Sequence, residues 1–183
     1  MPEDKRLPLG LHALKIIVCG DHSYVDVYVA IVPPHTDCIV FSIDGSFSAS
    51  ISVSGKNPKV RPGAVDVVRY WQDMGYLILY VTARPDIQQR LVVSWLSQHN
   101  FPHGLLFFTE GISAEPLRQK TNYLKSLLSE HQICIRAAYG SGKDVHVYKE
   151  VGLKKETVFA IGKVSKKWQD DCQVLIFHSG VSL

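Results

Sequence analysis

The chain has 183 residues and a formal net charge of +3, and its hydrophobic share of 46% and charged share of 20% are ordinary for a soluble globular protein. Its length fits one domain with a substantial core, and no apolar run approaches the roughly 20 residues that a membrane-spanning helix needs. The polar start predicts no signal peptide, so we expect a cytosolic protein. The mildly basic charge favours anionic surfaces, but no nucleic-acid recognition motif accompanies it.

Residues 11–32 contain two β-rich runs separated by the turn sequence Gly20-Asp21-His22, which predicts a β-hairpin. A hairpin needs a sheet to join, and two arrangements fit. It adds to the edge of the main sheet, or it is the end of a β-domain whose other strands lie outside this chain. We therefore divide the chain into an N-terminal β segment, residues 1–37, and a second domain, residues 38–183.

From residue 38 onward, short β-branched runs alternate with longer amphipathic runs. This pattern predicts βαβ units and a mainly parallel, Rossmann-like sheet of the α/β class. The predicted strands span residues 38–42, 77–82, 104–108, 133–138 and 157–161. Four helices are predicted. The first begins after residues 61–63, the second begins at residue 86, and the other two span about residues 114–129 and 143–151. The side chains expected to face the core from the first two helices are Val65, Val68, Trp71, Met74, Ile87, Leu91, Val92 and Trp95.

The four cysteines lie far apart in the sequence, and none has the spacing of metal ligands. This argues against structural zinc. Three of the four lie in apolar, strand-like runs, so we expect reduced residues of the core. They are Cys19, Cys38, Cys134 and Cys172.

Residues that can contact a ligand through polar side chains or backbone amides follow the predicted strands at the carboxyl edge of the sheet, where ligands bind in this class of fold. In chain order, with one lysine from the third helix, they are Ser42, Asp44, Thr82, Arg84, Lys120, Gly142, Lys143 and Asp144. A threonine hydroxyl, a lysine and backbone amides suit phosphate oxygens, and two carboxylates suit Mg²⁺. The glycine-rich turn at residues 140–142 lets amides approach an anion at a helix start. The sequence therefore predicts a site for phosphate and a divalent cation.

The order of these residues resembles the motifs of the haloacid dehalogenase-like (HAD-like) phosphatase superfamily. Its first motif, DxDx[TV], is matched by Ser42-Ile43-Asp44-Gly45-Ser46, and its other three motifs by Thr82, Lys120 and Asp144. The first motif departs at Ser42 and Ser46. Four segments are further similar to the carboxyl-terminal domain of the RdgB-type membrane-associated phosphatidylinositol transfer proteins, which is related to the catalytic domain of lipins. These segments are "FSIDGSF", "VRPGAVDVVRYWQDMGYLILYVTARPD", "WLSQHNFPHG" and "YGSGKDVHVYKEVGL".

The resemblance covers about residues 7–178 and implies a HAD-type fold with phosphatidic acid as the recognised headgroup. It also implies a large parent protein that acts peripherally at contacts between the endoplasmic reticulum and the plasma membrane. The loop at about residues 47–61 is too short for a cap domain, so we expect a capless site. The expected ligand-binding residues are Ser42, Asp44, Gly45, Ser46, Thr82, Arg84, Lys120, Gly142 and Lys143, and the expected Mg²⁺ ligands are Asp44 and Asp144.

Ser42 stands where active relatives carry the aspartate nucleophile, and its hydroxyl is not ionised at neutral pH. We therefore expect no turnover and no catalytic residue. The loss of one negative charge also weakens the repulsion of an anionic phosphate. Together with the resemblance, this substitution implies a pseudophosphatase that binds phosphatidic acid and recruits its parent protein to membranes. Two alternatives stay open: a weak Mg²⁺-dependent phosphatase, and a protein-interaction module with a vestigial site.

Three surface segments raise the question of membrane contact. Lys56, Lys59 and Arg61 either attract anionic lipid at the rim of the site or are solubilising loop charges. In the turn at residues 101–104, Phe101 either inserts into the interface or packs under the sheet, and His103 is a pH switch if it lies beside phosphate. We interpret the last group as a solvated helix face: Lys163, Lys166 and Lys167.

Overall fold

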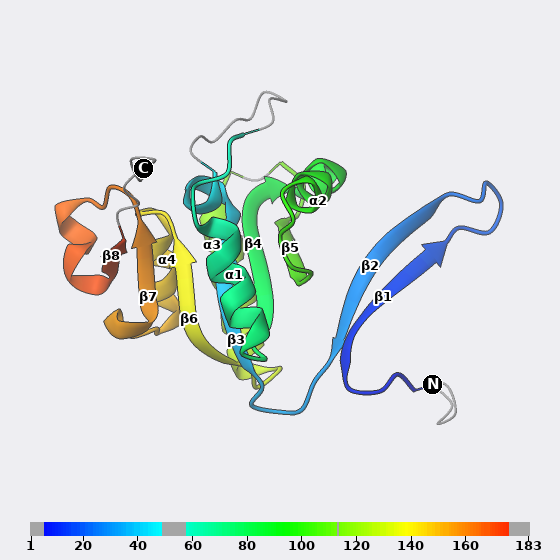
Figure 1. The fold of residues 1–183 in the computed structure, drawn as a ribbon, viewed down its shortest axis with the longest axis horizontal. Helices are drawn as coiled ribbons and strands as arrows, with labels where there is room; N and C mark the ends of the chain where they lie inside the picture. The colour runs from blue at the N-terminus through cyan, green and yellow to red at the C-terminus, as the bar shows by residue number, and fades with distance from the viewer. Residues whose placement is uncertain (1–5, 49–57, 113, 176–183) are drawn as a thin grey trace, which may run out of the picture.

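A six-stranded parallel sheet forms the body of the protein (Figure 1). The structure is a computed structural model that describes residues 6–48, 58–112 and 114–175. The strands lie in the order β5-β4-β3-β6-β7-β8, and each neighbouring pair is parallel. They are β3 (Asp37–Ser42), β4 (Leu77–Pro85), β5 (Leu105–Thr109), β6 (Cys134–Gly140), β7 (Val158–Ile161) and β8 (Gln173–Leu175). The predicted α/β class and the five predicted strands are confirmed.

Helices pack on both faces of this sheet. The helices are α1 (Ala64–Asp73), α2 (Gln89–Gln98), α3 (Pro116–Ser129) and α4 (Asp144–Val151). A hydrophobic cluster lies on each face of the sheet, and the central strand β3 contributes side chains to both, since its side chains alternate between the faces. Ile39 and Phe41 join the cluster under α1 and α2, whereas Val40 joins the cluster under α3 and α4. A strand buried on both faces is a continuous apolar run, which is the pattern seen in the sequence. Within the described residues, the helices are too short or too polar to cross a membrane.

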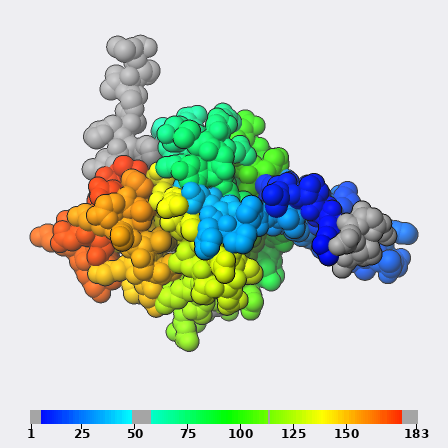
Figure 2. All heavy atoms as spheres, turned by 90° about the horizontal axis from the view of Figure 1, so that it is seen from below, coloured from blue at the N-terminus to red at the C-terminus, as the bar shows by residue number. Residues whose placement is uncertain are grey.

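The N-terminal hairpin forms a two-stranded antiparallel sheet of its own, from β1 (Gly10–Ile17) and β2 (Tyr24–Ile31). The hairpin prediction is confirmed, but the hairpin does not add to the edge of the main sheet. It stands out from the body (Figure 2) and contacts it through Tyr28, whose hydroxyl lies 2.7 Å from Nδ1 of His103. A cavity of about 530 Å³ is lined by residues of both parts. The exposed apolar side chains in and beside the hairpin include Leu9, Ile16, Ile17, Val18, Tyr24 and Val25.

The first two helices face the core with fewer side chains than the sequence pattern predicts. Met74, which follows α1, is 60% exposed, and Ile87 and Leu91 are 75% and 63% exposed. Ile87 lies in a 3₁₀ turn (Asp86–Gln88) ahead of α2. Because a 3₁₀ turn has about three residues per turn, it shifts the direction of the apolar side chains from the one that α-helical spacing predicts. The buried face of α2 consists of Val92, Trp95 and Leu96.

The chain after β7 contains two short elements that the pattern did not reveal. They are a 3₁₀ helix (Lys166–Asp171) and β8, which has three residues and pairs with β7. Such short segments carry no readable periodicity. The expected solvated face is found, because Lys163, Lys166 and Lys167 are all exposed.

The turn before β5 packs inward. Phe101 is 7% exposed, and its ring centroid lies 5.5 Å from that of Trp95, so packing rather than membrane insertion describes it. His103 precedes the amino end of β5, whereas the candidate phosphate site lies at the carboxyl ends of the strands. It therefore does not meet the condition under which a pH switch was expected.

The cysteines are all free, and the expectation that they belong to the core is wrong for one of them. Cys38 and Cys172 are buried and Cys134 is partly buried, but Cys19 is exposed in the turn of the hairpin. Burial raises the pKa of Cys38 to about 12, which keeps this thiol protonated and unreactive at neutral pH.

Candidate functional site

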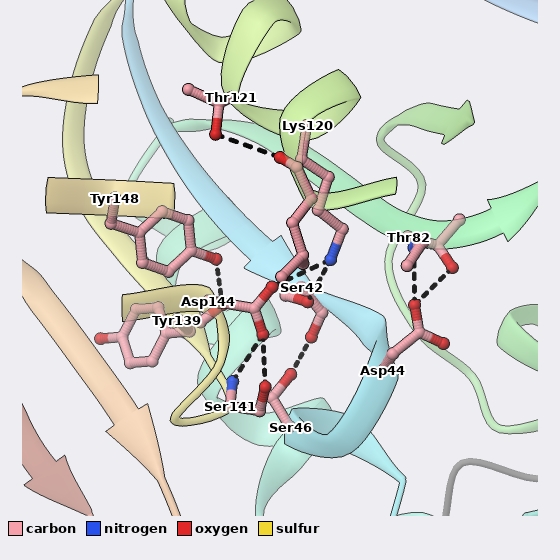
Figure 3. Close-up of polar contacts among 12 residues, drawn as sticks. Ser42, Asp44, Ser46, Thr82, Lys120, Thr121, Tyr139, Ser141, Asp144 and Tyr148 are labelled. Atoms are coloured by element: carbon pink, nitrogen blue, oxygen red, sulfur yellow. Dashed lines mark hydrogen bonds and ion pairs between the residues drawn. The ribbon is translucent and has the colours of Figure 1, made fainter. Parts of the chain in front are cut away.

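The candidate site lies where the order of the strands reverses. The chain runs from β3 outward to β4 and β5, and then returns to place β6 on the other side of β3. The connections after β3 and β6 therefore leave the sheet in opposite directions, and the crevice between them is where open α/β sheets bind ligands. The residues that directly follow these two strands meet here (Figure 3).

A tight turn after β3 places the residues of the first motif. Ser42 ends the strand and is fully buried. The hydroxyl of Ser46 donates a hydrogen bond to the carbonyl oxygen of Ser42. Gly45 has φ of +79°, and a Cβ there would lie 3.2 Å from the Cβ of Ser141. Both the left-handed backbone and the close approach favour glycine. Gly45 and Ser46 thus shape the turn, and neither lines the cavity described below.

Lys120 joins the two sides of the crevice. Its ammonium reaches from α3 and donates to the Ser42 hydroxyl at 3.0 Å and to Oδ1 of Asp144 at 2.9 Å (Figure 3). The side chains of Lys120 and Asp144 are only 2% and 3% exposed. A buried charge is tolerated when it is paired and hydrogen-bonded, and this pair meets both conditions.

The glycine-rich turn after β6 wraps around Asp144. Oδ2 of Asp144 accepts hydrogen bonds from the amide of Ser141 at 2.8 Å and from its hydroxyl at 2.6 Å. Burial alone would raise the pKa of Asp144, but the charge of Lys120 and the bonds from Ser141 outweigh it, so the pKa is lowered. A Cβ on Gly140 would lie 2.6 Å from the Cβ of Asp144, which explains the glycine. The Ser141 amide thus serves a carboxylate of the protein itself.

Asp44 is held on the other side of the crevice by residues at the end of β4. Its Oδ2 accepts hydrogen bonds from the Thr82 hydroxyl at 2.7 Å and from the Ala83 amide at 2.8 Å. Its Oδ1 accepts one from Nε of Arg84 at 3.1 Å. Arg84 is therefore an integral member of the site and the direct partner of Asp44. The Thr82 hydroxyl is fully buried and donates to Asp44.

A cavity of about 350 Å³ opens beside these two clusters. Of the predicted residues it is lined by Asp44, Arg84, Lys120, Lys143 and Asp144, and the others found along it are Ala83, Pro85, Gln88, Pro116, Leu117 and Ser141. The predicted residues Ser42, Thr82 and Gly142 lie outside the lining. A side chain at position 142 would meet the carbonyl oxygen of Lys163 at 2.8 Å, so Gly142 packs against the next loop. Ala83 and Pro85 lie one and three residues after Thr82 and were predictable by position, whereas nothing in the sequence marks Gln88, Pro116 or Leu117.

The arrangement does not fit the predicted Mg²⁺ site. Both oxygens of Asp44 and both oxygens of Asp144 already accept hydrogen bonds, two of them from cationic side chains. A divalent cation would have to compete with Arg84 and Lys120 for these oxygens, and hard cations need several free oxygen ligands. In the described ranges no group of three or more His, Cys, Asp or Glu side chains is placed to hold a metal.

The basic residues expected at the rim differ in their contacts. Arg61 donates to the carbonyl oxygen of Gly45 at 3.3 Å and so folds against the turn after β3. Lys59 is exposed, and Lys56 lies outside the described residues. Lys143, at the mouth of the cavity, is exposed and has no carboxylate partner among the described residues.

Sequence comparison finds close relatives over nearly the whole chain. The family model described as PITM 1-3, LNS2 domain, matches residues 39–162. Protein retinal degeneration B of Drosophila melanogaster is 57% identical over 175 residues, which is 96% of this chain and 14% of that protein. Human membrane-associated phosphatidylinositol transfer proteins 2 and 3 are 52% and 53% identical over 96% of this chain and 13% and 18% of their own lengths. The chain thus spans less than a fifth of these relatives.

Solved structures share the fold at low sequence identity. A Mesorhizobium loti protein named as a HAD-like phosphatase aligns with a TM-score of 0.60 and 12% identity, over 94% of this chain and 88% of its own. A phosphoserine phosphatase aligns with a TM-score of 0.55 and 13% identity, over 77% of this chain and 93% of its own. These similarities show the HAD-like fold that the sequence motifs predicted.

Proposed function

This chain belongs to the LNS2 domain family of the membrane-associated phosphatidylinositol transfer proteins, and from that premise we propose that it is a phosphatase-like domain that binds phosphatidic acid without hydrolysing it. Binding would recruit the parent protein to the cytosolic leaflet at contacts between the endoplasmic reticulum and the plasma membrane. The names of the relatives support membrane association and phosphatidylinositol transfer. The choice of headgroup and the lack of turnover are our proposals.

The contacts of Ser42 carry the proposal. A nucleophile needs access to phosphorus and a base to remove its proton. Ser42 is fully buried, and its nearest charged partner is the Lys120 ammonium at 3.0 Å, which is a donor and not a base. Asp44 does not supply a base either, because its oxygens accept bonds from Thr82 and Arg84. The site keeps a cavity while lacking an activated nucleophile, which favours binding over hydrolysis.

The charges around the cavity favour a phosphate monoester. Lys120 is balanced by Asp144 and Arg84 by Asp44, so the exposed ammonium of Lys143 adds a net positive charge at the mouth. Arg84 contacts Asp44 through Nε, and its terminal nitrogens can donate to a second anion. Guanidinium and ammonium groups both bind phosphate, and a dianionic monoester gains more from them than a diester. Since the carboxylates are engaged, we propose that binding needs no Mg²⁺.

A second function, the protein-interaction module, is favoured by the hairpin. Ile16, Ile17 and Val25 are 57%, 58% and 46% exposed on a two-stranded sheet that pairs with no third strand among the described residues. An isolated two-stranded sheet is marginal in water, so a covering surface in the parent protein would stabilise it. This function is compatible with lipid binding, since the hairpin contacts the body at the end of the sheet opposite the cavity.

Two exposed lysines provide a matched test of the lipid proposal. Lys143→Ala should weaken sedimentation with phosphatidic acid vesicles about fivefold, because it removes the unpaired charge at the mouth. Lys166→Ala, on the 3₁₀ helix outside the cavity lining, should change it by less than about twofold. Vesicles of phosphatidylserine at matched surface charge should bind more weakly, and EDTA should make no difference. Equal loss in the two variants would indicate a diffuse electrostatic surface.

The burial of Ser42 leads to a separate prediction. Ser42→Ala should leave binding to phosphatidic acid vesicles within about twofold of the unchanged chain, because the hydroxyl lies outside the cavity lining. The free energy of unfolding of this variant should fall by about 1 kcal/mol, since Lys120 loses one hydrogen-bond acceptor. Vesicle sedimentation and chemical denaturation measure the two effects. A large loss of binding in a folded variant would show that Ser42 contacts the headgroup.

A further inference from the structure

Three large aliphatic side chains are unusually exposed at the carboxyl edge of the sheet. Ile87 is 75% exposed, Leu91 63% and Ile112 92%. Together we call them the rim patch. A single exposed aliphatic residue needs no explanation, but a group of them beside a ligand cavity indicates a contact surface. The core does not need these residues, because α2 buries Val92 and Trp95 instead.

The fold brings the three residues to the edge of the cavity. Ile87 lies in the turn that directly follows β4, and Ile112 lies in the segment that directly follows β5. These strands are neighbours and parallel, so both connections leave the same edge of the sheet. Leu91 follows Ile87 by four residues, lies in the first turn of α2 and is exposed as well.

The cavity lining connects with both segments. Gln88, next to Ile87, and Pro116, at the start of α3, line the same cavity. The segment after β5 is tied to α3, because the Gln119 side chain accepts a hydrogen bond from the Glu110 amide at 2.7 Å. Pro85 and Leu117 continue the apolar lining inward from the rim. The apolar lining residues therefore lie close in the chain to the two segments that carry Ile87 and Ile112.

The charges at this edge fit an anionic lipid surface. Arg90 and Lys143 are exposed at this edge, on the connections that follow β4 and β6. Three acidic side chains lie on the same connections as the rim patch. Asp86 accepts a bond from the Ile87 amide, Glu115 pairs with Arg118 at 2.9 Å, and Glu110 is exposed. Surfaces that lie in a bilayer interface combine exposed aliphatic side chains with basic ones, and both are present at this edge.

We propose that the rim patch, Ile87, Leu91 and Ile112, inserts into the interface of an anionic bilayer and holds the mouth of the cavity at the level of the headgroups. A lipid headgroup then enters the cavity while its acyl chains stay in the membrane beside Pro85 and Leu117. The identity of the headgroup rests on the proposed function, whereas the insertion is a separate claim.

The test removes apolar surface without changing charge. The double variant Ile87→Ser/Ile112→Ser should bind phosphatidic acid vesicles about tenfold more weakly in sedimentation, because less apolar surface enters the interface. Binding of glycerol 3-phosphate, measured by calorimetry, should stay within about twofold, because the cavity is intact. Met74→Ser is the matched control: Met74 is 60% exposed, but it follows α1 at the opposite edge of the sheet, and vesicle binding should not change.

The possible outcomes separate the insertion from the headgroup. Unchanged vesicle binding by the double variant would overturn the proposal. If the double variant instead self-associated less than the unchanged chain at the same protein concentration, the patch would belong to a protein interface. Equal losses for vesicles and for glycerol 3-phosphate would also overturn it, since the serines would then have disturbed the cavity. If no form of the chain bound glycerol 3-phosphate or preferred phosphatidic acid, but the double variant still lost vesicle binding, the insertion would stand and the proposed headgroup would fail.

Discussion

Lys120→Ala is expected to lower the free energy of unfolding by about 3–5 kcal/mol at pH 7, because it leaves a buried carboxylate without its cation. Asp144 is 2% exposed, and Lys120 supplies its only charged partner among the described residues. Removing the ammonium also removes the donor to Ser42. Urea denaturation, followed by circular dichroism, measures the loss.

Lys125→Ala is the matched control for this prediction. Lys125 lies on the same helix but is 47% exposed, and its Nζ is 3.6 Å from Glu150. Exposed pairs of this kind contribute at most about 1 kcal/mol, so the control should remain close to the unchanged chain. Similar losses for the two variants would show that the buried ion pair stabilises the fold no more than an exposed one does.

The pH dependence distinguishes the ion pair from packing. In the unchanged chain, the pKa of Asp144 is lowered, since Lys120 and Ser141 outweigh the effect of burial. The stability from this pair is therefore fully present above the unfolded pKa of about 4 and is lost as the pH falls through the lower folded pKa. Without Lys120, the largest influence that lowers the pKa of Asp144 is lost, so this pKa should rise. The loss in free energy of unfolding caused by Lys120→Ala should accordingly become smaller as the pH falls from 7 towards 4, whereas a loss caused by poorer packing would not change with pH.

The sequence was sufficient to place the site, because the site depends on topology. Parallel strands all end at one edge, so residues that follow β3, β4 and β6 must meet there once the strands are identified. Asp44, Arg84 and Asp144 could be found in this way, and the motif order added Lys120. The family resemblance rested on longer segments of similar sequence, and the family is shown by the close relatives.

The pairing of side chains within the site was not predictable from the sequence. Residue order does not reveal that Arg84 contacts Asp44 or that Ser141 bonds Asp144, because these contacts depend on rotamers and on a few ångströms of backbone position. For the same reason a site that suited Mg²⁺ by composition proved to have its carboxylates occupied. Ile87 and Leu91 were predicted to face the core but are exposed, because a 3₁₀ turn shifts the helical phase. The spacing of apolar residues in the sequence does not reveal such a turn.

Asp44→Asn should strengthen binding to phosphatidic acid vesicles, by roughly thirtyfold, because it removes a negative charge from the cavity and releases Arg84 to the headgroup. The asparagine carbonyl can still accept bonds from Thr82 and the Ala83 amide, so the turn should keep its shape. An amide nitrogen cannot accept a bond from Arg84, and the guanidinium therefore loses its partner. Vesicle sedimentation in low salt measures the change.

The same substitution separates a receptor from an enzyme. In a Mg²⁺-dependent phosphatase, removing Asp44 would weaken substrate binding through the metal and abolish any release of phosphate. In the receptor that we propose, binding rises and phosphate release is absent both before and after the change. Asp86→Asn is the matched control, since Asp86 is an exposed carboxylate outside the cavity lining and removes the same formal charge. A gain that is equal in both variants would be due to net charge alone, whereas a gain confined to Asp44→Asn would place the headgroup beside Arg84.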